Sequence, residues 1–165
     1  MNQKVILQSR IRFLIIFFIC ALAASGLTAI PLQWELKTLL PLFGNGTRFS
    51  SMFPVLTKWL ELINTGIQNG YGQFPFLAYG TDWLAFGHIA IAIAFIGPLR
   101  DPIKNIWVIE FGMVACFLII PWALIFGTIR NIPFFWQLID MSFGVIGMIP
   151  LWIVRRDIRR LASEA

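Results

Sequence analysis

The stretch FLIIFFICALAASGLTAI, residues 13–30, decides the fold because it contains no charged side chain. As an α-helix these residues extend about 27 Å, close to the roughly 30 Å of hydrocarbon in a bilayer. With its apolar neighbours the stretch predicts a membrane span at residues 11–32. A helix is favoured over a strand because period-two alternation is absent and unpaired backbone groups are not tolerated in lipid.

Three further apolar segments have the length of a span, at residues 81–99, 102–128 and 132–154. The 165-residue chain is 58% hydrophobic and 13% charged, with a mean hydropathy of +0.78. Soluble domains have about 25% charged residues, so this chain has too few polar groups to cover a surface in water. The sequence predicts one all-α membrane domain over residues 1–165, built as a bundle of four transmembrane helices.

The basic residues are divided unequally between the two predicted sides of the membrane. Four lie in the external connections, and nine lie on the side of the chain ends: Lys4, Arg10, Arg12, Arg100, Lys104, Arg155, Arg156, Arg159 and Arg160. By the positive-inside rule the more basic side is cytoplasmic. We expect a multi-pass protein of a plasma membrane, such as a bacterial inner membrane, with both termini in the cytoplasm.

The N-terminus also fits a second interpretation. Lys4, Arg10 and Arg12 followed by an apolar run and by small residues at 23–26 resemble a secretory signal peptide. The apolar run continues to Leu32, which is longer than the usual hydrophobic region of such a peptide and favours a retained first helix. Cleavage would leave three spans.

The connection between the first two spans is long and contains a helical pattern at residues 51–69. Its apolar residues form one stripe, while Lys58, Glu61 and Gln68 lie off that stripe. Ser51 is a candidate cap, and Gly70 a candidate end. We expect an external amphipathic helix that lies in the membrane interface or covers the mouth of the bundle. The other connections are short turns, with Asp101 and Asn131 as expected caps.

Three ionisable residues lie inside predicted spans: His88, Glu110 and Asp140. A charge at the bilayer centre costs at least about 2.5–3.5 kcal/mol, so such residues usually have a role. His88 lies six residues after Asp82, about 9 Å along the helix, and Asp140 lies about 12 Å from Ile132. Both depths are measured from the outer face, so we expect these two side chains to form a pair. Glu110 lies about 12 Å from the inner face, in a separate layer.

Helical phase adds neighbours to this candidate site. Gln137 shares one face of its helix with Asp140, Gly144 and Gly147, and small residues on a face permit close helix packing. Asp82 and Arg130 lie at the outer ends of their spans and are candidates to close the mouth. The site has two open interpretations: a ligand or proton-handling site made of the residues His88, Asp140, Gln137, Asp82, Arg130 and Glu110, or polar side chains that only hold the helices together.

Several kinds of chemistry lack their residues. The chain has one His, and Cys20 and Cys116 do not form a C-x-x-C pair, so we expect no metal and no cofactor. Nucleic-acid binding is not expected, since the basic residues flank apolar segments. We therefore expect an outward-facing pocket for a small or lipid-like ligand, or for a proton-coupled substrate. The alternatives are a non-catalytic subunit or homodimer within a membrane complex, and a lipid-modifying enzyme, whose catalytic residues would be unknown.

Overall fold

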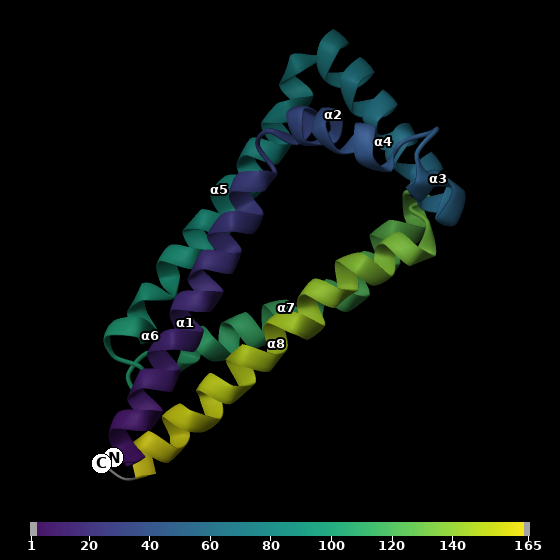
Figure 1. The fold of residues 1–165 in the computed structure, drawn as a ribbon. Helices are drawn as coiled ribbons and strands as arrows, with labels where there is room; N and C mark the ends of the chain where they lie inside the picture. Colours follow the sequence, from purple (N-terminus) through teal and green to yellow (C-terminus); the bar gives the residue numbers. More distant parts are fainter. Residues whose placement is uncertain (1–2, 164–165) are drawn as a thin grey trace. The chain divides into compact units, whose positions relative to one another are not determined.

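The computed structural model describes residues 3–163, and every regular element in this range is helical (Figure 1). In chain order the elements are α1 (Gln3–Thr28), α2 (Leu32–Phe43), α3 (Arg48–Met52), α4 (Pro54–Gln73), the short 3₁₀ helix η1 (Pro75–Ala78), α5 (Tyr79–Ala94), α6 (Ile96–Arg100), α7 (Ile106–Ile129) and α8 (Phe134–Ser163). The predicted all-α class is confirmed.

Four helical segments are long and apolar enough to cross a membrane: Gln3–Thr28, Pro75–Arg100, Ile106–Ile129 and Phe134–Ser163. They correspond to the four predicted spans. In each segment, only 22% of the 18-residue apolar stretch is buried inside the protein. Lipid would therefore cover most of the apolar surface of these helices. These features define a multi-pass α-helical membrane protein.

Prolines account for two of the differences in helix boundaries. The first helix ends at Thr28 rather than at residue 32, because a proline at position 31 disfavours a helical conformation at Ile30. The second span is divided between α5 and α6 at Phe95. There the ring of Pro98 would clash with the carbonyl of Ala94 in a continuous helix.

The third and fourth helices begin later than predicted. Asp101 does not cap a helix at Pro102; its carboxylate accepts a hydrogen bond from the backbone of Lys104 in a turn, and α7 begins at Ile106. Asn131 ends α7 instead of starting α8. Its φ of 55° and the bond from the Ile132 amide to the Gly127 carbonyl form a Schellman-type end. The fourth helix also extends nine residues past the predicted end, to Ser163.

The chain divides into two compact units, which we describe separately. The terminal unit contains the chain through Leu22 and from Ile91 onward, and the central unit is Ala23–Ala90. In the terminal unit α7 and α8 run side by side, as Figure 1 shows. The core of this unit combines buried residues of α1, α7 and α8 with Phe95: Ile11, Ile15, Phe18, Val108, Ile109, Cys116, Leu151, Val154, Ile158 and Leu161.

Glycines allow α7 and α8 to approach closely. A β-carbon at Gly144 would collide with the backbone carbonyl of Cys116 and lie 3.2 Å from Ile119 Cβ. A β-carbon at Gly112 of α7 would lie 3.0 Å from Leu151 Cδ1 of α8. The small-residue face predicted for the fourth span therefore packs on α7, which is the use expected of glycine between membrane helices.

The central unit contains a helical region that the sequence analysis described only in part. The prediction missed α2 and α3, and the helix expected at residues 51–69 is α4, which begins at Pro54 and continues past Gly70 to Gln73. Ser51 does not cap α4, whose N-cap is Phe53 without a side-chain hydrogen bond; Thr47 caps the preceding helix α3, where its hydroxyl accepts the Ser50 amide hydrogen. Whether α4 is external and lies in the interface remains a prediction.

The same unit contains a close contact between the end of α1 and α5. A β-carbon at Gly26 would lie 2.7 Å from His88 Cβ and 3.0 Å from the Ala85 carbonyl oxygen. Gly26 is buried, whereas Ala24 and Ser25 are exposed. Gly26 is therefore a small residue that the packing of α1 against α5 requires.

We predict that Gly144→Ala lowers the free energy of unfolding in detergent by about 1–3 kcal/mol, because the new methyl group meets backbone that cannot move aside. Gly87→Ala is the matched control, since a β-carbon there meets no atom of the described chain within 4 Å. This control should be neutral or stabilising, as alanine favours helix. Equal losses for both variants would contradict the proposed packing role.

An even number of spans predicts that both chain ends lie on the same side of the membrane. Alkaline phosphatase, which is active only outside the cytoplasm, should be active when inserted after Gly46 and inactive when fused to the C-terminus. A fluorescent protein fused to either end should fold and fluoresce in the cytoplasm. Phosphatase activity at the C-terminus would refute the predicted orientation.

Candidate functional site

Asp140 lies on α8 in an open groove against α7. The groove has a volume of about 810 Å³ and lies wholly within the terminal unit. Its walls are mainly apolar and include Ile119, Trp122 and Phe126 of α7, and its two charged residues are Asp140 and Arg130. Among the described residues no hydrogen bond or ion pair engages the half-buried Asp140 carboxylate. This groove therefore combines an apolar surface with an acid that has no protein partner.

Gln137 lies one turn before Asp140 on α8 and packs against Gly127 of α7. Its side chain is 5% exposed, and it fills the space left by Gly127, where a β-carbon would lie 2.5 Å from Gln137 Cδ. The amide nitrogen donates to the Ile132 carbonyl at 2.8 Å, while the amide oxygen is buried without a partner among the described residues. Gln137 thus has a structural role at the end of the α7–α8 pair and one unused acceptor.

His88 is half-buried in the central unit, on α5. Its Nδ1 lies 2.9 Å from the Leu84 carbonyl of the same helix, and its Cβ packs on Gly26. Since one ring nitrogen engages the helix backbone, the other is left for a further partner. His88 and Asp140 belong to different units, so their pairing remains a prediction.

Asp82 and Arg130, expected at the mouth, also belong to different units. Asp82 lines a shallow depression of about 250 Å³ with Tyr79, Trp83 and Phe86. Arg130 caps the end of α7, where its amide donates to the Phe126 carbonyl, and its side chain borders the Asp140 groove. A joint role for the two residues stays a prediction.

Glu110 has a separate environment, as its depth predicted. Arg155 donates through Nε to the Glu110 carboxylate at 2.8 Å, and Arg159 donates to the same oxygen at 3.3 Å. Arg155 lies fifteen residues after Asp140 on α8, which is about 22 Å along the helix. Glu110 is therefore held by the arginine-rich end of α8 and is remote from the Asp140 groove.

The sequence analysis missed an ion pair between the first and last helices. Arg10 donates through Nε and Nη2 to the two carboxylate oxygens of Asp157, at 2.5 and 2.7 Å. The Asp157 side chain is fully buried, and Arg156 Nε lies 3.6 Å from it. Helical phase contained the signal: Val154, Asp157, Ile158 and Leu161 share one face, so the acid lies on the buried side of an otherwise basic tail.

No group of three His, Cys, Asp or Glu side chains within residues 3–163 is arranged to hold a metal ion. Cys116 is buried beside Gly147, whereas Cys20 is exposed on α1; neither forms a disulfide. Ser142, the hydroxyl nearest to Asp140 on α8, donates to the Ile139 carbonyl of its own helix. The Asp140 carboxylate can accept hydrogen bonds or pair with a cation.

The chain matches no family model, and no curated protein or solved structure is significantly similar to it. The class of protein rests on the four apolar helices, and the candidate site rests on the groove around Asp140.

We predict that Asp157→Asn lowers the free energy of unfolding by about 1.5–3 kcal/mol, as expected for loss of a charged hydrogen-bonded pair. Glu110→Gln should cost less than about 1 kcal/mol, because the Glu110 side chain is 41% exposed and the Asp157 side chain is not exposed. Chemical unfolding in detergent micelles measures both. In a double-mutant cycle with Arg10→Gln, the coupling free energy should account for most of the loss caused by Asp157→Asn. Additive losses of the two variants would refute the ion pair.

Proposed function

We propose that the protein binds an apolar molecule carrying a cationic group in the groove between α7 and α8. The observation that carries the proposal is the Asp140 carboxylate, which lines an apolar groove and has no partner in the described chain. A volume of about 810 Å³ falls within the roughly 300–1,000 Å³ of typical ligand pockets. A bound cation would offset the cost of keeping this charge inside a span.

The shape of the wall supports an aromatic or lipid-like body for the ligand. Trp122 and Phe126 form a tilted aromatic pair with ring centroids 4.5 Å apart, and both border the groove. Aromatic faces attract cations as well as apolar groups. In a proton-coupled version of this function, the same carboxylate exchanges a proton for the cation, which requires no second acidic residue.

A second candidate function is a non-catalytic subunit of a membrane complex. It is favoured by the two ion pairs, Arg10–Asp157 and Glu110–Arg155, which use charged residues to join helices of the terminal unit. Purification in a mild detergent separates the candidates: a partner protein in fixed stoichiometry supports the subunit, and a homogeneous protein that binds ligand supports the groove.

Two probes of similar shape and opposite charge test the groove. Tetraphenylphosphonium should bind the purified protein in nanodiscs more tightly than tetraphenylborate, as measured by quenching of tryptophan fluorescence. Asp140→Asn should weaken phosphonium binding by about tenfold or more, the effect of losing about 1.5–3 kcal/mol of charged interaction. Borate binding should not fall.

Glu35→Gln provides the matched control, because it removes one acidic charge from α2 in the central unit. This variant should bind phosphonium like the unmodified protein. Equal phosphonium binding by the protein and by Asp140→Asn would refute the role of Asp140. In liposomes, a proton flux that depends on the phosphonium gradient and is lost in Asp140→Asn would support the proton-coupled version.

A further inference from the structure

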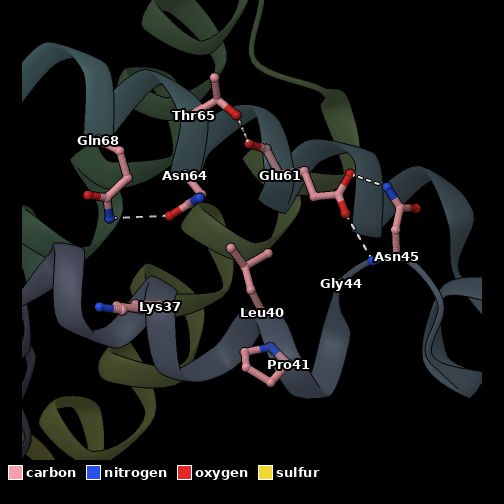
Figure 2. A pocket seen from close by; sticks show the side chains of 9 residues that line it. All are labelled: Lys37, Leu40, Pro41, Gly44, Asn45, Glu61, Asn64, Thr65 and Gln68. Atoms are coloured by element: carbon pink, nitrogen blue, oxygen red, sulfur yellow. Dashed lines mark hydrogen bonds between the residues drawn. The ribbon is translucent and has the colours of Figure 1, made fainter.

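A second pocket lies in the central unit, between α2 and α4, and is independent of the Asp140 groove. Its volume is about 710 Å³. Figure 2 shows Lys37, Leu40 and Pro41 on the α2 side, and Glu61, Asn64 and Gln68 on the α4 side. Unlike the first groove, this pocket is lined largely by polar groups, with one positive and one negative side chain.

Lys37 supplies the positive charge. Its side chain is exposed, and no hydrogen bond or ion pair within residues 3–163 engages its ammonium group. The carbonyl of Lys37 also lacks its normal helical donor, because Pro41, four residues later, has no N–H. Lys37 therefore offers three donors and one backbone acceptor at the α2 wall.

Glu61 supplies the negative charge and is held in a fixed position. One carboxylate oxygen accepts the Asn45 backbone amide at 2.9 Å, and the other accepts the Asn45 side-chain amide (Figure 2). A carboxylate has about four lone-pair sites, so two acceptor sites remain. The loop after α2 thus fixes the acid without using its full capacity to bind a ligand.

The amides of α4 add donors between the two charges. Gln68 Nε2 donates to Asn64 Oδ1 at 3.4 Å, as Figure 2 shows. This bond leaves the Asn64 amide hydrogens, one Gln68 hydrogen and the Gln68 oxygen for a ligand. A ligand that fits must therefore carry an anion that accepts several hydrogen bonds and a cation that donates them.

The two helices that form the pocket also carry exposed apolar side chains. Trp34 and Leu42 of α2 are 66% and 62% exposed, and Leu62 of α4 is 62% exposed. Exposed apolar side chains of this size, next to polar groups, are typical of helices at a membrane interface. A placement of α2 and α4 at the membrane interface would bring the polar pocket to the level where phospholipid headgroups lie.

We propose that the α2–α4 pocket binds the headgroup of a zwitterionic aminophospholipid. Lys37 and the amides of Asn64 and Gln68 bind the phosphate, and the free lone pairs of Glu61 accept hydrogen bonds from the primary ammonium group. The shared chemistry is that of phosphoethanolamine, and the exposed apolar side chains of the two helices select the lipid over the free soluble ester. The choline headgroup has no N–H and cannot donate to Glu61, while the glycerol headgroup has no cation.

Native mass spectrometry of the purified protein tests this selectivity with phosphatidylethanolamine, phosphatidylcholine and phosphatidylglycerol of identical acyl chains. The ethanolamine lipid should be retained several-fold more than the other two. Lys37→Ala should reduce its retention about tenfold. Glu61→Gln keeps an acceptor for Asn45 but removes the charge, so it should reduce retention of the ethanolamine lipid and leave that of the glycerol lipid unchanged.

Lys58→Ala and Glu35→Gln are the matched controls, because they remove the same charges from α4 and α2 outside the pocket. Both should retain the ethanolamine lipid fully, and none of the four variants should alter phosphonium binding at Asp140. Equal retention of ethanolamine and choline lipids, or an equal loss in Lys58→Ala, overturns the proposal. Displacement of the lipid by soluble phosphoethanolamine at similar concentration overturns the lipid source.

Discussion

A charged side chain that folding removes from water needs a partner, and this constraint governs how helices of the terminal unit are joined. Asp157 has no exposed side-chain surface, yet both of its oxygens accept from Arg10. Glu110 is neutralised by Arg155 and Arg159 in the same way. Two of the arginines beside the last span thus bind a carboxylate on a neighbouring helix, in addition to the orientation that their charge predicts. Asp140 is the exception, because its half-buried carboxylate has no partner among the described residues.

Helix periodicity and composition predicted the number and type of spans because both depend on local sequence. The boundaries depended on individual prolines, and here the prediction was less accurate. Pro98 divides the second span at Phe95, whereas α7 continues through Pro121, so the presence of a proline alone does not determine whether a helix ends. The helix α2 was missed because residues 33–43 were treated only as part of a long connection.

For the candidate site, the sequence predicted some of the packing and missed other contacts, while the joint role of its residues stays a prediction. Helical phase correctly grouped Gln137 with the glycines that pack on α7, and depth separated Glu110 from Asp140. Helical phase also places Asp157 on the apolar face of the basic tail, a signal that the prediction did not include. The α2–α4 pocket could not be predicted, because Lys37 and Glu61 are far apart in sequence and line the same pocket only in the folded chain. The turn between α2 and α3 includes Gly46 in a left-handed conformation, with a φ of 84°.

The Arg10–Asp157 pair joins residues 147 positions apart, and this separation has a consequence for synthesis. A ribosome adds about 5–20 residues per second, so Arg10 is added to the chain roughly 7–30 s before its acid partner. During that interval its guanidinium must remain hydrated at the headgroup level, which the long arginine stem allows. The ion pair therefore forms only after almost the whole chain has been made, and a protein truncated before Asp157 would lack this link between its first and last helices.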